Sequence, residues 1–167
     1  MKTIQCLFII WVFLAGGTAA QAQTQKVSVS ISGLTCSQCS RSVEMQLKKL
    51  AFIQSVEMDL KNTTAVLNIR SNARTDFRAI ARAVTDAGFS VAGLEASMYA
   101  SQLKIDNNGC MQSADGRFYI VNSPLTSGRD LVTFEFLGKP FNSFKVKQQS
   151  PSTPCQKNAT YFIKARQ

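Results

Sequence analysis

Residues Gly33-Leu34-Thr35-Cys36-Ser37-Gln38-Cys39 mark the point at which the hydrophobic period of the chain changes. Before them, apolar and polar side chains alternate over 27–31, a period that predicts a half-buried strand. After them, Val43, Leu47 and Leu50 recur at intervals of four and three, which predicts an amphipathic helix. We therefore expect both thiols on a loop that runs into the N-terminus of a helix.

The position of Cys36 and Cys39 favours thiolate chemistry. Unpaired backbone N–H groups and the positive end of the helix dipole lower the pKa of a cysteine thiol from its free value of about 8.5. The chain has no histidine, so a metal bound here would have sulfur ligands. Two thiolates suit Cu(I) and the softer heavy metals, whereas structural zinc normally needs four ligands. By itself the C-x-x-C spacing is compatible with metal binding, redox chemistry or a disulfide.

The surroundings of the two cysteines resemble one known family. Val43, Glu44 and Leu47 follow the C-x-x-C loop on the expected helix, and Asp86-Ala87-Gly88-Phe89 places a glycine and an aromatic residue before a later strand. In this order, residues 26–96 resemble a heavy-metal-associated domain, the ferredoxin-like module of copper chaperones, copper-pump N-termini and the periplasmic mercury-binding protein. Leu34 departs from the family, which most often has methionine there, and we expect a small effect.

The remaining pattern of residues 26–96 agrees with the fold that the resemblance implies. Alternation predicts strands at 55–60 and 64–69, joined as a hairpin by Lys61-Asn62-Thr63. Thr75 is the expected cap of a second helix, Gly88 its end, and 89–94 the fourth strand. The expected fold is an α+β, ferredoxin-like βαββαβ open-faced sandwich with both helices on one face of the sheet.

The N-terminus has the pattern of a secretory signal peptide over 1–22. Lys2 precedes an apolar stretch at 7–15, and Ala20-Gln21-Ala22 provides an A-x-A cleavage site. The apolar stretch is shorter than a bilayer span, although a retained N-terminal anchor is an alternative. We expect an exported protein, periplasmic or secreted, in which Cys6 is lost and four cysteines and a net charge of +8 are retained.

The second half is expected to form a small all-β domain of unknown family over 105–167, after a linker at 97–104. Period-two patterns predict strands at 117–121, 130–136, 143–147 and 160–164. Cys110 and Cys155 are the only thiols here, and in an oxidising compartment we expect a disulfide between them. Free thiols or a second soft-metal site are the alternatives.

The resemblance also implies roles for individual residues. Cys36 and Cys39 would hold one metal ion, Phe89 would shield it from solvent, and the hydroxyl or backbone of Thr35 would hydrogen-bond a cysteine sulfur. The family binds Cu(I), Hg(II), Zn(II) or Cd(II) with nearly the same loop. Zinc and cadmium members often add an acidic residue, whereas Ser37 and Gln38 are neutral. Cu(I) or Hg(II) is therefore expected in preference to Zn(II) or Cd(II). Of these two ions, Cu(I) is expected first because it is the more abundant.

These residues predict a metal carrier and not an enzyme, because the sequence contains no recognisable general base, oxyanion hole or cofactor loop. Its partner would be a metal donor or acceptor such as a membrane transporter. One alternative is a thiol-disulfide oxidoreductase, with Cys36 as nucleophile and Cys39 as resolving thiol. Another is a metal-sensing or docking module for the β-rich half. Nucleic acid is not an expected partner of an exported protein, and the basic charge is expected to be solvated or to contact an anionic membrane surface.

Overall fold

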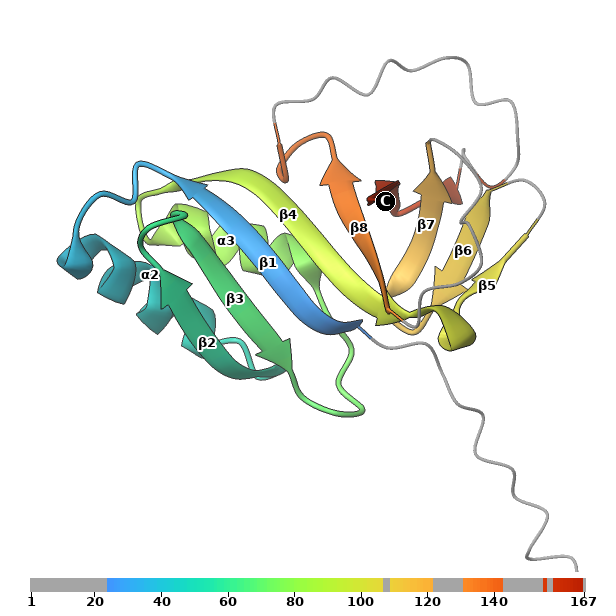
Figure 1. The fold of residues 1–167 in the computed structure, drawn as a ribbon, viewed down its shortest axis with the longest axis horizontal. Helices are drawn as coiled ribbons and strands as arrows, with labels where there is room; N and C mark the ends of the chain where they lie inside the picture. The colour runs from blue at the N-terminus through green and yellow to red at the C-terminus, as the bar shows by residue number, and fades with distance from the viewer. Residues whose placement is uncertain (1–23, 107–108, 122–130, 143–154, 156–157, 167) are drawn as a thin grey trace, which may run out of the picture.

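A computed structural model of the chain describes residues 24–106, 109–121, 131–142, 155 and 158–166 (Figure 1). These residues form an α+β fold with two α-helices and one nine-stranded sheet. The elements are β1 (Thr24–Ser32), α2 (Ser37–Lys48), β2 (Ile53–Asp59), β3 (Thr64–Ile69), α3 (Phe77–Asp86), β4 (Ser90–Tyr99), η1 (Ala100–Gln102), β5 (Lys104–Ile105), β6 (Cys110–Ser113), β7 (Gly116–Ile120), β8 (Leu131–Leu137) and β9 (Tyr161–Arg166). The predicted signal peptide at 1–22, with Cys6, and the predicted strand at 143–147 lie outside the described residues.

The first half has the predicted βαββαβ order. Its strands lie in the sequence β2-β3-β1-β4 across the sheet, and all three pairings are antiparallel. Alternate residues of β1, Val27, Val29 and Ile31, are buried, as the period-two pattern predicts. They face α2 and α3, which cover the same face of the sheet (Figure 1). The predicted open-faced sandwich is therefore confirmed for this half. No helix in the described part of the chain is long and apolar enough to cross a bilayer.

The start of α3 differs from the prediction. Asp76, not Thr75, is the N-cap: its carboxylate accepts a hydrogen bond of 3.0 Å from the backbone N–H of Ala79. The Thr75 backbone N–H instead donates to the buried carboxylate of Asp115, at 2.6 Å. That contact places Thr75 outside the helix and moves the cap by one residue. The helix ends before Gly88, whose φ of +89° requires a glycine, as predicted.

The second half does not form a separate sheet among the described residues, so the predicted second all-β domain is not confirmed. β4 continues past residue 94 to Tyr99, and β8 pairs with it along 95–99. The predicted linker at 97–104 therefore contains the end of β4, η1 and the start of β5. The remaining strands extend the sheet in the order β8-β9-β7-β6-β5, with β7 and β9 parallel. Period-two patterns predict strands, but they do not identify the partners of those strands.

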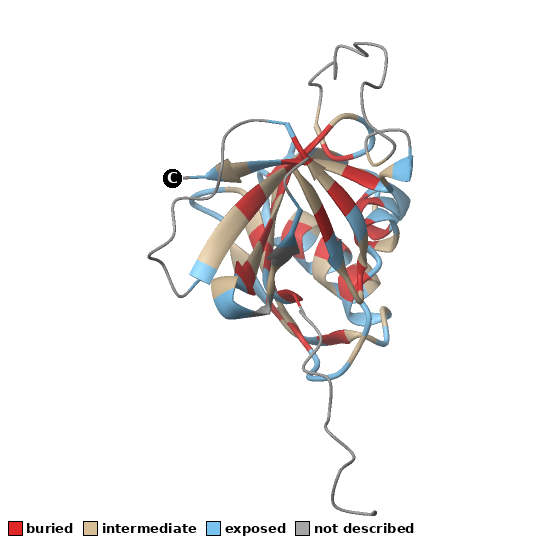
Figure 2. Ribbon diagram, turned by 90° about the vertical axis from the view of Figure 1, so that its right-hand side faces the viewer, coloured by how far each residue is buried: buried red, intermediate tan, exposed pale blue. Residues whose placement is uncertain are grey.

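One hydrophobic core runs through both halves. The ring of Phe77, at the start of α3, is fully buried and lies 4.4 Å from that of Phe136, 5.3 Å from that of Tyr161 and 6.1 Å from that of Phe118. Buried residues follow one another along the sheet in Figure 2. The helix that belongs to the first half thus packs against aromatic side chains of the second.

Asp115 provides a polar connection between the same two halves. Its side chain is buried at the turn between β6 and β7. One carboxylate oxygen accepts from the backbone N–H of Thr75, and the other accepts from the backbone N–H of Thr24 at 3.2 Å and from the Thr24 hydroxyl at 2.6 Å. These bonds tie the β6–β7 turn to the start of β1 and to the residues before α3, and they satisfy the buried charge.

Candidate metal centre

Cys36 occupies the N-cap of α2, and Cys39 lies in the first turn of that helix. The backbone of Cys36 is extended, with φ of −134° and ψ of 155°, and its sulfur accepts a hydrogen bond of 3.1 Å from the backbone N–H of Cys39. The Cys36 carbonyl accepts the first helical bond, from Ser40 N–H at 3.1 Å. The sulfur therefore takes the place that a serine or aspartate oxygen has at most helix starts.

The N-terminus of α2 is a favourable place for negative charge on the two sulfurs once they are reduced. No acidic residue lies in the first turn of α2, so the helix dipole and the free N–H groups are not neutralised there. Cys36 is exposed and Cys39 is half-buried, which leaves one sulfur open to an incoming molecule. In the structure the two cysteines are joined as a disulfide, with Cα atoms 5.2 Å apart. Reduction of this bond would give a pair of thiols that point into one space.

The loop before Cys36 is fixed by a glycine and an inward-facing leucine. Gly33 has a φ of +84°, a conformation that side-chain-bearing residues rarely adopt. A Cβ atom at Gly33 would lie 3.9 Å from Cδ1 of Phe89, so the Phe89 ring packs against the start of the loop. Leu34 is buried in the core, and the small effect expected of its difference from the family stays a prediction. Gly33 and Leu34 thus fix the path of the chain into Cys36.

The predicted roles of Phe89 and Thr35 differ in how the structure places them. Phe89 is half-buried and lies beside the loop, where a shielding ring would have to be. Thr35 is exposed, and among the described residues its hydroxyl has no hydrogen bond to either sulfur. Both roles remain predictions.

The described residues contain no cluster of three or more histidine, cysteine, aspartate or glutamate side chains that could hold a metal. Cys36 and Cys39 form a two-sulfur site. Cys110 and Cys155 come together elsewhere, with Cα atoms 6.1 Å apart, a separation that a disulfide spans. Cys110 lies on β6, five strands from β1 in the sheet, so the two cysteine pairs occupy different regions of the molecule.

Sequence reasoning did not single out three polar residues that the structure brings together. Arg74, Arg117 and Asp115 lie around the β6–β7 turn and the residues before α3. The only local signal is Asp115-Gly116, which predicts a turn. The contacts of Asp115 join residues 40 and 91 positions away, a distance over which a single sequence carries no pairing signal.

Comparison with known proteins supports one family. A family model described as "Heavy-metal-associated domain" matches residues 28–90. The mercuric transport protein periplasmic component of Pseudomonas fluorescens is 31% identical over 68 residues, which are 41% of this chain and 74% of that protein. A probable copper-exporting P-type ATPase of Archaeoglobus fulgidus is 28% identical over 83 residues, which are 50% of this chain and 10% of the ATPase. The chain therefore spans about a tenth of the ATPase.

Solved structures also match part of the chain. The oxidised MerP of Ralstonia metallidurans CH34 is 31% identical, covers 41% of this chain and 97% of its own, and has a TM-score of 0.37. The residues that the family model matches contain the loop with Cys36 and Cys39 as well as α2, β2, β3 and α3. The chain belongs to the heavy-metal-associated domain family.

Proposed function

We propose that this protein is a soft-metal carrier that holds one Cu(I) or Hg(II) ion between Cys36 and Cys39 and passes it to a partner protein. The observation that carries the proposal is the loop itself, which places two sulfurs at the N-terminus of α2 with Cys39 N–H directed at the Cys36 sulfur. Soft thiolates select soft cations, and deprotonation on binding makes the affinity depend on pH.

Transfer would proceed by exchange of thiolates. A thiolate of the partner adds to the ion to form a three-coordinate intermediate, one cysteine of the carrier leaves, and a second partner thiolate completes the exchange. The metal stays bound to sulfur in each step. Exposed Cys36 is the sulfur that the partner reaches first, and half-buried Cys39 is the last to leave. Binding can therefore be tight while transfer remains fast.

Cu(I) is the first candidate ion, and Hg(II) is the second. The printed names of the relatives support both, since one is a probable copper-exporting ATPase and another is a mercuric transport protein. The neutral residues between the cysteines, Ser37 and Gln38, disfavour Zn(II) and Cd(II). A membrane transporter for the same metal is the proposed partner.

Export is the second part of the proposal. The pattern of residues 1–22 supports it, and so does the periplasmic relative. Mass spectrometry of protein recovered from the cell envelope would give a chain that begins at Gln23. A chain that retains residue 1 would show that the signal is not cleaved. In an oxidising compartment a thiol reductant would have to deliver two electrons and two protons to the Cys36–Cys39 disulfide before metal could bind.

A thiol-disulfide oxidoreductase is the alternative function. The disulfide between Cys36 and Cys39 and the exposure of Cys36 at a helix N-terminus favour it. Against it, Thr35 precedes the pair where thioredoxin-like motifs normally have an aromatic residue, and neither proline nor glycine separates the two cysteines. A dithiol-disulfide exchange assay with a small disulfide substrate distinguishes the two functions.

The deciding experiment is an anaerobic titration of the reduced protein with Cu(I) against a competing chelator, followed by the same titration with Hg(II). The carrier proposal expects one equivalent to bind tightly to the wild type. The Cys36→Ser, Cys39→Ser double variant should no longer bind this equivalent tightly. The Cys110→Ser, Cys155→Ser double variant is the matched control, because it removes two sulfurs from another region.

Three results would separate the interpretations. Tight binding of Hg(II) with weak binding of Cu(I) would retain the carrier and change its cargo. Binding that survives in the Cys36→Ser, Cys39→Ser variant would place the metal elsewhere in the chain. Failure of both soft ions to bind, with rapid disulfide exchange, would replace the carrier by the oxidoreductase.

A further inference from the structure

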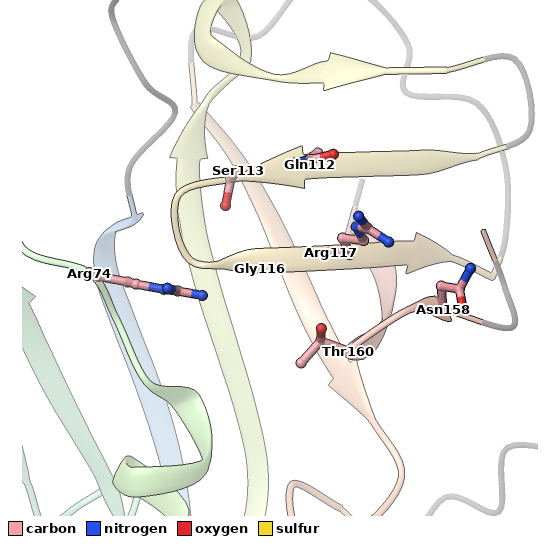
Figure 3. Close-up of a pocket in the computed structure, with 7 residues that line it drawn as sticks. All are labelled: Arg74, Gln112, Ser113, Gly116, Arg117, Asn158 and Thr160. Carbon is pink, nitrogen blue, oxygen red and sulfur yellow. The ribbon is translucent and has the colours of Figure 1, made fainter.

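A polar pocket of about 310 Å³ lies between the residues that precede α3 and the β6–β7 hairpin (Figure 3). The loop that contains Cys36 and Cys39 does not contribute to it. Its volume lies at the lower end of the range of about 300–1,000 Å³ that is usual for small-ligand sites. The residues that line it are Arg74, Gln112, Ser113, Gly116, Arg117, Asn158 and Thr160. They come from three stretches of chain, so only the folded protein assembles the pocket.

Donor groups from different elements line this space. In Figure 3 the guanidinium of Arg74 extends toward the hairpin, and Ser113 and Thr160 lie on either side of β7. The Ser113 hydroxyl oxygen accepts from Asp115 N–H at 3.1 Å, which leaves its proton free to donate to a ligand. The Thr160 N–H donates to the Arg117 carbonyl at 2.9 Å and thereby holds Thr160 beside the hairpin.

Two positively charged residues and no negatively charged one line the pocket. Arg74 and Arg117 are exposed, and neither forms an ion pair with any residue that the structure describes. No aspartate or glutamate is among the lining residues. The nearby carboxylate of Asp115 faces inward, where both of its oxygens accept hydrogen bonds from Thr24 and Thr75. Asp76 caps α3 through Ala79 N–H.

We propose that this pocket, between Arg74 and Arg117, is a binding site for a phosphate group. Two guanidinium groups offer planar pairs of N–H donors that match the oxygens of an oxyanion. The hydroxyls and side-chain amides around them supply further neutral donors. A tetrahedral phosphate has more acceptor oxygens than a planar carboxylate, so it can use donors that approach from several sides. This site is independent of the metal-carrier function.

The phosphate could be free in solution or belong to the headgroup of an anionic lipid. The pocket opens to solvent beside α3, where Arg78 and Arg82 follow Arg74 at four-residue intervals and are also exposed. Arg78 donates to the Thr160 carbonyl at 3.4 Å and lies over the Tyr161 ring, so part of its side chain is held in place. The shared chemistry is the phosphate group, and the experiment separates the two sources.

The test is a titration of the full-length mature protein with inorganic phosphate at constant ionic strength, followed by amide chemical shifts in NMR spectra. We expect saturable shifts at Gly116 and the other lining residues. Arg74→Gln and Arg117→Gln should each weaken binding at least about tenfold, because each removes a charge-assisted pair of hydrogen bonds. Arg82→Gln is the matched control, since Arg82 is an exposed arginine of α3 that does not line the pocket. Thermal unfolding of each variant checks that it is folded.

A second arm measures sedimentation of the protein with vesicles of phosphatidylglycerol and, separately, of phosphatidylcholine. Binding to phosphatidylglycerol alone, weakened in the Arg74 and Arg117 variants and retained in Arg82→Gln, would support the site with a lipid headgroup as the source. Binding of inorganic phosphate with the same variant pattern would support free phosphate. An equal response to acetate, an equal loss in all three variants, or no binding in either arm would overturn the proposal.

Discussion

The two halves of the sheet differ in how they are built. The half formed by β2, β3, β1 and β4 pairs antiparallel throughout and is covered by α2 and α3. The half formed by β8, β9, β7, β6 and β5 includes a parallel pair, and it brings Cys110 of β6 to a Cα–Cα distance of 6.1 Å from Cys155. The first half contains the proposed metal site, and the second half shares its core through Phe77 and its polar contacts through Asp115.

The two halves also differ in the range of the contacts that set their conformation. Short-range contacts set the conformation of the loop with Cys36 and Cys39, because the two cysteines are three residues apart and α2 starts between them. Long-range contacts set the conformation of the second half, where Cys110 and Cys155 are 45 residues apart in the sequence. We therefore expect changes in the second half to alter the stability of the whole chain while leaving metal affinity unchanged.

The largest expected effect comes from the aromatic core that joins the halves. Phe77→Ala should lower the free energy of unfolding by about 3–5 kcal/mol, because it leaves a cavity among Phe118, Phe136 and Tyr161. Urea unfolding measured by circular dichroism checks this value. Phe162→Ala is the control, since Phe162 is only half-buried on β9 and should cost less. Equal losses in the two variants would show that Phe77 does not connect two halves of one core.

The next largest effect concerns the cysteines of the second half. If Cys110 and Cys155 form the predicted disulfide, their replacement by serine should cost about 2–4 kcal/mol, because the unfolded chain loses a closed loop of 45 residues. Metal affinity should be unchanged. Thiol labelling under denaturing conditions and urea unfolding measure the two properties. Two reactive thiols at these positions in the oxidised protein would rule out the bond.

A smaller effect is expected at Asp115. Asp115→Asn keeps the shape of the side chain but places an N–H donor against the donors of Thr24 or Thr75, at a cost of about 1–3 kcal/mol. Asp86→Asn is the control, because Asp86 is exposed at the end of α3. Thermal unfolding compares the two variants. A loss no greater at Asp115 than at Asp86 would mean that the buried carboxylate does not hold the halves together.

The smallest effect is a pH dependence centred on Tyr161. Burial, followed by the negative charge of Asp76, raises the pKa of Tyr161 above its ordinary value of 10, with Arg78 opposing the shift. Because the unfolded chain loses this proton first, stability is full below pH 10 and falls as pH rises through the raised pKa. Tyr161→Phe should show a shallower decline. Urea unfolding between pH 8 and pH 11 tests this, and equal slopes in the two proteins would contradict it.

Much of the first half could be predicted from the sequence, because its signals are local. The alternation at 27–31, the hairpin around Lys61-Asn62-Thr63 and the change of period at Gly33 correspond to β1, to β2 with β3, and to the loop before α2. The N-cap of α3 is Asp76, one residue after the predicted Thr75. Thr75 and Asp76 are both good caps by type, and the choice between them depends on Asp115, which lies 40 residues away.

The second half could be predicted only as a set of strands. The expected strands at 117–121, 130–136 and 160–164 overlap β7, β8 and β9, while β5 and β6 were not predicted. β8 pairs with the end of β4, residues 95–99. Part of that stretch, 97–99, was predicted to belong to a linker. Strand pairing depends on which edges are free after the chain has folded, and hydrophobic period carries no information on that.

The pairing of β4 with β8 has a consequence for self-association. In the order β2-β3-β1-β4, β4 would be an outer strand with a row of free N–H and C=O groups along ten residues. Such an edge can recruit a strand from another molecule and seed aggregation. Here β8 covers residues 95–99 of it, and among the described residues this side of the sheet ends instead at β5, which has two residues, while β2 remains the edge on the other side. The second half thus protects this edge of the sheet from intermolecular strand pairing, because the outer strand is now β5, which is too short to pair stably with a strand of another molecule.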